Sequence, residues 1–321
     1  MILDFEHMEK KYRVGLIGVG SIAHIAHLPI LAARTDVEMV GAFAEHIESV
    51  QRTQKSYAIQ NAVHNMDELL NLGLDCAFVL SPKTVHAEQV VRLLEAGVDV
   101  FCEKPMGMTL KEAYSMADAA ARTGKKLMIA FNRRYAPVYR KAKEVYGQMS
   151  PDVLIAQKNR PASEYRATLE NAIHMVDILR YFCGECVKVD ACSKFTDPLY
   201  ETLTTAQLQF ENGSVAMLVA DRASGQWVET LEMHGHNKSV LVNCPDTITV
   251  TDNEQSHTTS MTPLAYGWAK VVDKMGFTQE VDHFFDRLKN DQQPLTSGAD
   301  AYKTQELMHR ILTTAGLPGL E

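Results

Sequence analysis

Two residues of this chain, a lysine and a histidine, stand in contexts that suit acid-base chemistry. Lys104 lies in Glu103-Lys104-Pro105, directly after the apolar run at residues 98–102. Ligands of an open parallel sheet bind at the carboxyl ends of its strands, so a lysine that follows a buried strand is expected to face a site. Pro105 favours an extended Lys104 and so restricts where its side chain points. Taken alone, the tripeptide also fits a solvated lysine in an ordinary turn.

His174 is the second candidate, within an apolar segment whose pattern predicts a helix over 168–182. Residues four apart share a helix face, so Glu170 can orient the imidazole or share a proton with it, and Asp177 lies nearby on that face. A histidine titrates near neutral pH, which suits a general acid or base. The alternatives are a core histidine and a solvated glutamate at the helix start. The combination with Lys104 favours the catalytic interpretation.

A glycine-rich turn upstream indicates which ligand these residues would meet. An apolar strand runs into Gly18-Val19-Gly20-Ser21-Ile22-Ala23, and a helical pattern follows. Gly18 permits a tight turn, Gly20 lets the backbone approach a pyrophosphate, and Ala23 allows close packing of helix and strand. The phosphates would lie at the helix N-terminus. A further strand at 37–43 arrives at the expected distance, so the sequence predicts a dinucleotide site rather than an ordinary strand-helix turn.

The elements that must position these residues alternate between strand and helix over the first part of the chain. This alternation predicts right-handed βαβ units and a parallel sheet. The expected strands are 14–18, 37–43, 76–80, 98–102 and 126–131, and the expected helices are 23–33, a stretch from 47, 85–96 and 110–122. Ser81 and Pro82 follow the third of these strands, at the same carboxyl edge.

The pattern changes after about residue 132, where alternating apolar runs predict antiparallel hairpins. One hairpin joins 204–210 to 214–220 through a tight primed turn at Asn212-Gly213, and another joins 228–234 to 239–243. We therefore predict an α/β protein with a doubly wound parallel sheet over 1–131. A second domain over 132–321 would carry a large, mostly antiparallel sheet. Such a sheet often leaves one face to a partner subunit, so we expect a homo-oligomer, either a dimer or a tetramer.

Composition restricts the class of partner. The chain has 321 residues, 46% of them hydrophobic and 22% charged, as is typical of a globular enzyme of about two domains. A net charge of -8 without a long basic block argues against nucleic acid or an anionic membrane, and favours a small-molecule ligand. Residues 1–10 lack the basic start and apolar core of a signal peptide, and no apolar stretch reaches membrane-spanning length. We therefore expect a cytoplasmic protein.

Cys183 and Cys186 form a C-x-x-C pair, the spacing of redox pairs and of half a zinc site. No second close pair and no histidine pair completes a tetrahedral ligand set, so we predict no metal site. The pair instead marks the end of a helix, with Gly184 as its cap. The six cysteines are scattered through apolar segments, which fits reduced thiols better than a disulfide framework.

Over nearly its whole length the chain resembles the glucose-fructose oxidoreductase and inositol dehydrogenase (Gfo/Idh/MocA) family, and most of all its MviM-like branch. The resemblance rests on the order and spacing of three motifs. They are the glycine turn at 18–23, Glu103-Lys104-Pro105, and the helix with Glu170, His174 and Asp177. The segment Phe131-Asn132-Arg133-Arg134-Tyr135-Ala136-Pro137 supports them.

The resemblance implies an NAD(P)-dependent oxidoreductase that moves a hydride between nicotinamide and a hydroxyl or carbonyl carbon of a sugar-like or polyol substrate. It implies that His174 takes the hydroxyl proton and that Lys104 binds the reacting oxygen and lowers the pKa of the base. Glu170 would hold the imidazole, although the family usually has aspartate there and often has glycine where this chain has Ala172. A nucleotide-binding sensor or regulatory protein without turnover is the alternative.

The residues predicted to bind the cofactor fall into four places along the chain. They are Gly18, Gly20, Ser21, Ile22 and Ala23, then Ala44 and Glu45, then Ser81, and finally Glu103 and Lys104. An acid at the end of the second strand binds a ribose 2′-hydroxyl, whereas a small residue followed by arginine accepts a 2′-phosphate. Ala44 occupies the usual acidic position, and the first arginine is distant along the chain, at Arg52. Glu45 would repel a phosphate, so the sequence favours NAD over NADP.

Four residues of the second domain are candidates to contact polar groups of the substrate. They are Arg133, Lys158, Arg160 and Asp177. For the three cations, the alternative is that they are surface residues at strand ends.

Overall fold

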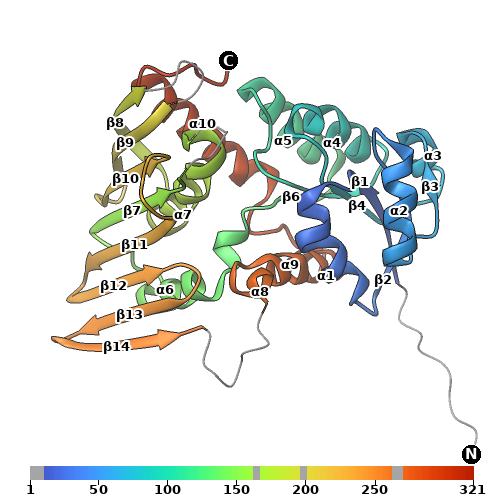
Figure 1. Cartoon of the computed structure of the whole chain (residues 1–321). Coiled ribbons are helices and arrows are strands. Elements are labelled where there is room, and N and C mark those ends of the chain that lie inside the picture. The colour runs from blue at the N-terminus through green and yellow to red at the C-terminus, as the bar shows by residue number, and fades with distance from the viewer. Residues whose placement is uncertain (1–10, 162–166, 196–200, 262–269) are drawn as a thin grey trace, which may run out of the picture. The chain divides into compact units, whose positions relative to one another are not determined.

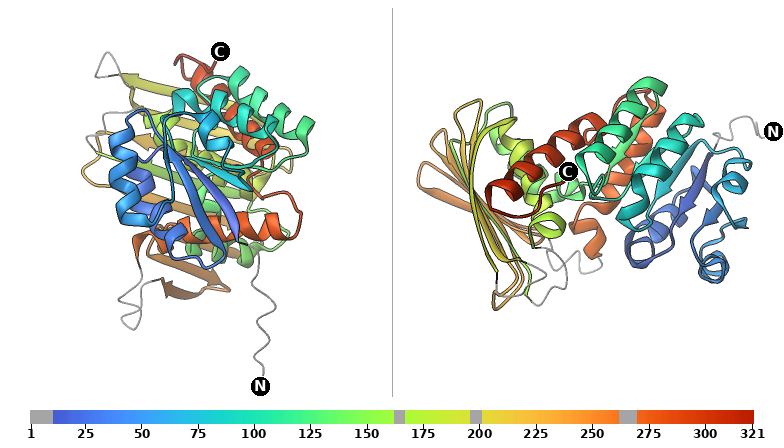
Figure 2. Two further views of the ribbon diagram at one scale, coloured as in Figure 1. Left: turned by 90° about the vertical axis from the view of Figure 1, so that its right-hand side faces the viewer. Right: turned by 90° about the horizontal axis from the view of Figure 1, so that it is seen from above.

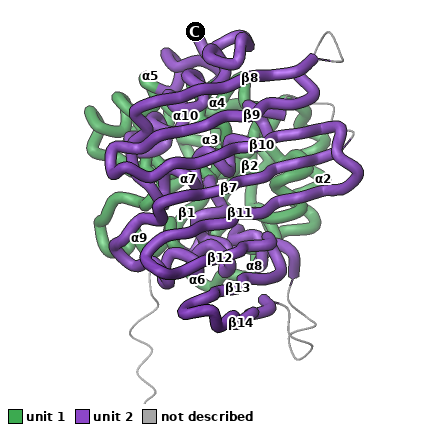
Figure 3. Tube along the Cα trace, turned by 90° about the vertical axis from the view of Figure 1, so that its left-hand side faces the viewer, with its two compact units in different colours: residues 1–107, 114–130, 283–298 green, residues 108–113, 131–282, 299–321 purple. Residues whose placement is uncertain are grey.

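The computed structural model describes residues 11–161, 167–195, 201–261 and 270–321. The chain forms two compact units, coloured separately in Figure 3. Unit 1 comprises residues 1–107, 114–130 and 283–298, and unit 2 comprises residues 108–113, 131–282 and 299–321. The change of unit after residue 130 lies beside the boundary expected at 131. The segments 108–113 and 283–298, however, each group with the other unit.

Unit 1 is built on a six-stranded parallel sheet with the strand order β3-β2-β1-β4-β5-β6. The strands are β1 (Tyr12–Ile17), β2 (Val37–Phe43), β3 (Ala62–Val63), β4 (Cys76–Val79), β5 (Asp99–Cys102) and β6 (Leu127–Ile129). β4 is buried along its whole length, because helices cover both faces of a doubly wound sheet. The strand order reverses between β1 and β4, which is where open α/β sheets bind their ligands. The predicted doubly wound sheet is confirmed.

The helices of unit 1 lie on both faces of this sheet. They are η1 (Ala23–His27), α1 (Leu28–Ala32), α2 (Ile47–Tyr57), α3 (Met66–Leu70), η2 (Lys83–Val85), α4 (His86–Glu95) and α5 (Leu110–Thr123). The chain crosses from β1 to β2 in one direction along the sheet and from β4 to β5 in the other. Because both crossovers are right-handed, α1 and α4 lie on opposite faces, as Figure 1 shows. Gly97 and Gly124, which follow α4 and α5, have φ angles of 82° and 69°, as is typical of glycine C-caps. The sequence did not reveal β3 and α3, because such short elements carry almost no periodic pattern.

A segment from near the C-terminus completes unit 1. Phe284, in the second half of α9 (Phe277–Lys289), packs edge-on against Phe78 of β4 and Phe101 of β5, with ring centroids 5.7 and 5.6 Å away. Further along, the Ile129 amide donates a hydrogen bond to the Thr296 carbonyl oxygen over 2.9 Å. The Thr296 hydroxyl donates to the Ile129 carbonyl oxygen over 2.7 Å. This segment therefore covers the edge strand β6.

Unit 2 is built on an eight-stranded sheet with the order β14-β13-β12-β11-β7-β10-β9-β8. The strands are β7 (Val153–Asn159), β8 (Cys186–Phe195), β9 (Glu201–Phe210), β10 (Val215–Asp221), β11 (Val228–Gly235), β12 (Lys238–Asn243), β13 (Thr247–Asp252) and β14 (Gln255–Ser260). Every neighbouring pair is antiparallel except β7 and β10, which are parallel. The predicted large, mostly antiparallel sheet is confirmed.

Both predicted hairpins are present, but the primed turn lies in the other one. In the β9–β10 hairpin the Phe210 amide donates to the Ser214 carbonyl, so three residues form the loop, and only Gly213 has a positive φ, 89°. The prediction of a two-residue turn at Asn212-Gly213 was therefore wrong. In the β11–β12 hairpin, His236 and Asn237 have φ angles of 56° and 59°, which a type I′ turn requires.

The helices of unit 2 all lie on the same side of its sheet, as the right-hand view of Figure 2 shows. They are η3 (Asn132–Tyr135), α6 (Pro137–Tyr146), η4 (Ala167–Ala172), α7 (Ile173–Cys183), α8 (Val271–Lys274), the start of α9, and α10 (Gly298–Thr314). Figure 3 views the opposite face, which no helix of unit 2 covers within the described residues. α7 ends at Gly184, whose φ is 81°, so the predicted helix end is confirmed.

Neither a metal-binding cluster nor a membrane-spanning helix is present among the described residues. No group of three or more His, Cys, Asp or Glu side chains could hold a metal ion. None of the helices combines the length and the apolar character that crossing a bilayer needs.

Candidate functional site

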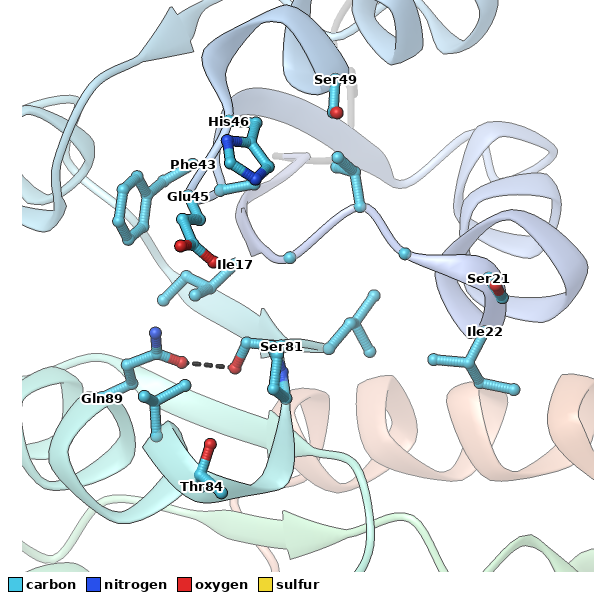
Figure 4. Close-up of a pocket in the computed structure, with 17 residues that line it drawn as sticks. Ile17, Ser21, Ile22, Phe43, Glu45, His46, Ser49, Ser81, Thr84 and Gln89 are labelled. Carbon is cyan, nitrogen blue, oxygen red and sulfur yellow. Dashed lines mark hydrogen bonds between the residues drawn. The ribbon is translucent and has the colours of Figure 1, made fainter. Parts of the chain in front are cut away.

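A cavity of about 600 Å³ opens in unit 1 at the carboxyl edge of the parallel sheet, at the switch point between β1 and β4 (Figure 4). It is lined by the turn after β1, by the end of β2 with the start of α2, and by the segment from Leu80 to Gln89. Among the residues predicted to bind the cofactor, it brings together Gly18, Gly20, Ser21, Ile22, Ala44, Glu45 and Ser81. Ala23, Glu103 and Lys104 are not among its lining residues.

The glycine turn after β1 fits a dinucleotide. Gly18 has a φ of 89°, and a Cβ atom there would lie 2.6 Å from the Ser81 backbone nitrogen, so only glycine lets β1 and β4 approach this closely. No atom lies within 4 Å of a Cβ position at Gly20, so a pyrophosphate has room to approach its backbone. Ala23 is fully buried, as its predicted packing role requires.

The helix that starts at this turn begins as the π-helix η1 and continues as α1. No side chain caps its first N–H groups. These donors and the positive end of the helix dipole favour a phosphate over the turn. The remaining lining is mostly apolar, with Phe43, Leu80 and Val85 available for the flat face of a base.

The segment after β4 contributes residues that the sequence reasoning did not name. Thr84, Val85 and Gln89 line the cavity, and the Ser81 hydroxyl donates to the Gln89 side-chain oxygen over 2.5 Å (Figure 4). Residues that follow a strand at the switch point are expected to face a ligand. The position of Ser81 directly after β4 could therefore have indicated that the residues after it also line the cavity.

Glu103 and Lys104 follow β5 at the same edge of the sheet. Glu103 is buried, and its carboxylate accepts a hydrogen bond from His27 Nε2 at 2.8 Å and one from the Lys104 amide at 3.1 Å. Burial raises the pKa of Glu103, but the hydrogen bond and charge of His27, with the Lys104 charge, outweigh it and lower that pKa below its usual value. Glu103 thus anchors the segment to η1, and its predicted contact with the cofactor has no support in this geometry.

His86 connects the Lys104 segment to the cavity wall. Its Nδ1 lies 3.0 Å from the Pro105 carbonyl oxygen, and its Nε2 lies 3.0 Å from the Ser81 carbonyl oxygen. Lys104 itself is half-buried, and the Lys104–Pro105 peptide bond is cis. A buried histidine therefore fixes the backbone next to Lys104 relative to a residue that lines the cavity.

His174 and Glu170 belong to unit 2. His174 lies in the first turn of α7 and is 9% exposed, and Glu170 lies in η4 and is half-buried. η4 is a π-helix, whose hydrogen bonds run from residue i to i+5, and it passes directly into α7. Glu170 and His174 therefore stand on either side of this junction, and the expected contact between them stays a prediction.

Asp177 is fully buried and holds the fold of unit 2 together. Its carboxylate accepts two hydrogen bonds from Arg134, at 2.6 and 2.7 Å, and one from the Thr304 hydroxyl at 3.0 Å. Burial raises the pKa of Asp177, although Arg134 opposes the shift. Its partners tie η3, α7 and α10 together, so the predicted role in substrate binding is not supported.

Arg133 and Lys158 are buried around a carboxylate that the sequence reasoning missed, Glu229. Arg133 donates two hydrogen bonds to Glu229, at 2.7 and 2.9 Å, and Lys158 forms an ion pair with the same carboxylate. The exposed fractions of the three residues are 5%, 1% and 3%, so the alternative of surface cations was wrong for Arg133 and Lys158. Glu229 stands 96 and 71 residues away from its partners, and no local pattern could pair them.

The charges of this cluster shift the pKa values of its members. Burial raises the pKa of Glu229, but the two cations outweigh it and hold that pKa well below the ordinary glutamate value. Burial lowers the pKa of Lys158 to about 8, a shift that Glu229 opposes and Arg133 reinforces. Arg160 lies apart from the cluster, with its guanidinium 4.8 Å from the ring centroid of Trp227, which is 55% exposed.

Comparison with known proteins agrees with this architecture. Residues 12–131 match the model of an oxidoreductase family with an NAD-binding Rossmann fold, and residues 140–241 match the GFO/IDH/MocA C-terminal domain. D-apiose dehydrogenase of Paraburkholderia graminis is 23% identical over 95% of this chain and 88% of its own. Myo-inositol 2-dehydrogenase of Thermotoga maritima is 24% identical over 90% and 91%.

A solved structure shows the same fold. The MviM dehydrogenase of Clostridium difficile superimposes with a TM-score of 0.86 at 24% identity, over 95% of this chain and all of its own. The predicted family and enzyme class are thereby confirmed, and the cofactor is a nicotinamide dinucleotide. The chain belongs to the Gfo/Idh/MocA family of NAD-binding oxidoreductases.

Proposed function

We propose that this protein transfers a hydride between a nicotinamide cofactor and a hydroxyl or carbonyl carbon of a sugar-like or polyol substrate. The observation that carries the proposal is the cavity at the β1/β4 switch point, with Lys104 at the same sheet edge. A relative that acts on D-apiose and one that acts on myo-inositol support a substrate rich in hydroxyl groups.

The roles of the catalytic residues rest on their motifs. When bound, the nicotinamide supplies the hydride acceptor or donor. His174 takes the proton from the substrate hydroxyl during oxidation and returns it during reduction. Lys104 donates a hydrogen bond to the reacting oxygen and stabilises the negative charge that develops there. Glu170, one methylene longer than the family's usual aspartate, supports the imidazole from η4.

Of the residues predicted to contact substrate, we retain Arg160. Its guanidinium and the exposed Trp227 ring form a pair with one cationic and one flat apolar surface, which suits a hydroxylated ligand. Arg133, Lys158 and Asp177 instead act on the fold, because their charges are engaged in buried ion pairs.

We also propose that the chain forms a homo-oligomer through the open face of its unit 2 sheet. Apolar side chains stand exposed across the centre of this face: Val153 of β7 at 41%, Met217 of the neighbouring β10 at 53%, and Leu241 of β12, two strands from β7, at 46%. A second copy of the same face would remove these side chains from water.

The proposed function is tested with the reduced cofactor and a panel of keto-sugars and inososes. Purified protein is mixed with NADH or NADPH, and nicotinamide fluorescence is followed before and after each carbonyl compound is added. We expect saturable binding and then oxidation by at least one compound of the panel. Binding without oxidation across a broad panel would favour the sensor alternative instead.

Lys104→Ala and His174→Ala separate chemistry from binding. Each is expected to lower kcat about 100-fold or more while the cofactor Kd stays within about twofold, because both interactions act on the transition state. Loss of His174 should also flatten the pH-rate profile near neutrality. The exposed Lys111→Ala and His257→Ala variants serve as controls. Wild-type kcat in either active-site variant would remove that residue from the mechanism.

A further inference from the structure

A second, smaller pocket adjoins the cofactor cavity. Its volume is about 220 Å³, and it lies between η1 and α2, with Val19 and Ser49 shared between the two spaces. The rest of its lining is His24, Arg52, Thr53 and Ser56. It therefore presents a guanidinium, an imidazole and three hydroxyl groups, and no carboxylate. This is the donor set of an anion site.

Arg52 is the arginine of unit 1 that lacks an acidic partner among the described residues. Its Nη2 donates a hydrogen bond to the Ser49 hydroxyl over 3.0 Å, which holds the side chain along the face of α2 toward the shared wall. The guanidinium keeps further donors for a ligand. The other arginines of unit 1 pair with carboxylates, namely Arg13, Arg34, Arg92, Arg122 and Arg287.

His24 reaches the pocket from the other side, and hydrogen bonding fixes which of its nitrogens is a donor. The Thr53 hydroxyl donates its hydrogen to the Ser49 carbonyl oxygen at 2.9 Å, so Thr53 Oγ1 accepts from His24 Nε2 at 3.1 Å. The same hydroxyl thereby links η1 to α2 across the floor of the pocket. Thr53 is 2% exposed, so this link is built into the fold and is not a chance surface contact.

The position of the pocket identifies the anion. In a dinucleotide domain the ribose 2′-position is read at the end of the second strand, beside the glycine turn. Val19 belongs to that turn and Ser49 to the helix that follows β2, so the pocket opens where a group on the 2′-oxygen would point. We propose that it binds the 2′-phosphate of NADP(H), with Arg52 and Ser49 as the main contacts.

This inference rests on the proposed dinucleotide function and revises the preference for NAD. Arg52 is eight residues from Ala44 along the chain, and in part for that reason the sequence favoured NAD. In the fold, however, α2 places Arg52 in the lining of the smaller pocket. Glu45, the source of the expected repulsion, lines the larger cavity and not this pocket.

The test compares NADPH with NADH, by nicotinamide fluorescence, in wild type, Arg52→Ala and the control Lys55→Ala. Lys55 is an exposed cation of the same helix that does not line the pocket. Wild type should bind NADPH about 10- to 100-fold more tightly than NADH, the effect of one or two charge-assisted hydrogen bonds. Arg52→Ala should remove most of this preference and leave the Kd of NADH unchanged, whereas Lys55→Ala should keep it.

Competition by 2′,5′-ADP and by 5′-AMP gives a second measurement that needs no turnover. The expected result is that 2′,5′-ADP displaces NADPH at a lower concentration than 5′-AMP, and that Arg52→Ala abolishes the difference. Equal affinity of wild type for NADH and NADPH would overturn the inference while leaving the proposed function intact. Failure of both dinucleotides to bind would overturn the two together.

Discussion

At the scale of single residues, Glu229 was not predicted from the sequence, yet it is the ion-pair partner of Arg133 and Lys158, which were. Arg133 and Lys158 carry positive charge into the interior of unit 2, and Glu229 is the carboxylate that neutralises part of it. The sequence identifies the two cations as candidates to contact a polar ligand. It does not identify their partner, because β11 pairs with β7 only in the folded sheet.

Glu229→Gln is predicted to destabilise the protein strongly. The substitution preserves volume but leaves two buried cations without a countercharge, which costs about 3–5 kcal/mol of unfolding free energy. Urea denaturation followed by circular dichroism measures the change. The control is Glu232→Gln on the same strand, since Glu232 is half-exposed and pairs with His234 at the surface. A loss below about 1 kcal/mol would show that the cluster does not stabilise the fold.

The lowered pKa of Glu229 determines how the difference in unfolding free energy between wild type and Glu229→Gln depends on pH. A carboxyl group whose pKa is lower in the folded than in the unfolded state stabilises the fold above its unfolded value, about 4.3, and loses that effect as pH falls through the folded value. The gap between wild type and Glu229→Gln should therefore be constant from about pH 6 to 7 and shrink only in acid.

At the scale of elements, the sequence predicts where helices lie better than whether each helix is an α-helix or a π-helix. The helix after the glycine turn and the helix with His174 were both expected, yet each begins with a π-helical segment, η1 and η4. An apolar pattern five or six residues long cannot distinguish helical pitches, because it covers little more than one turn. The pitch of the helix therefore has to come from the structure at Ala23 and at Glu170, whereas the presence of a helix there was predictable.

Gly18→Ala is predicted to damage the cofactor cavity through the fold. Alanine is strained at a φ of 89°, and its Cβ would lie 2.6 Å from the Ser81 nitrogen, so β1 and β4 must move apart at more than about 1 kcal/mol. Thermal unfolding should show a lower Tm, and cofactor binding should be lost. Gly20→Ala is the matched comparison: with no atom within 4 Å of the added methyl, its Tm should equal wild type while dinucleotide affinity falls. Equal Tm values for the two variants would contradict this account.

At the scale of the whole molecule, the order of helices and strands along the chain predicted both sheets. The sequence did not predict which segments far apart in the chain contact each other. The alternation of strand and helix sufficed for the doubly wound order, and the alternating runs sufficed for the hairpins. Nothing local indicated that residues 283–298 would join unit 1, where Phe284 packs on Phe78 and Phe101. Such contacts depend on the completed fold rather than on neighbouring residues.

Met217→Lys is predicted to break the homo-oligomer. A charge in the middle of the open sheet face would be buried without a partner in a face-to-face assembly, so the oligomer should dissociate at micromolar concentration. Size-exclusion chromatography with light scattering measures the mass. Tyr114→Lys, at a position of unit 1 that is 59% exposed, should leave the mass unchanged. A monomeric wild-type protein would exclude this interface.

Transfer of deuterium from the reduced cofactor to a carbohydrate would demonstrate the proposed hydride transfer itself. The protein is incubated with a panel of keto-sugars and inososes and, in separate reactions, with NADH or NADPH deuterated at the transferable position, and the sugars are examined by mass spectrometry. At least one compound is expected to gain one deuterium at the carbon that becomes a carbinol. In Lys104→Ala this gain should fall about 100-fold or more. Cofactor binding without any labelled carbohydrate, or equal labelling by Lys104→Ala, would contradict the proposed mechanism.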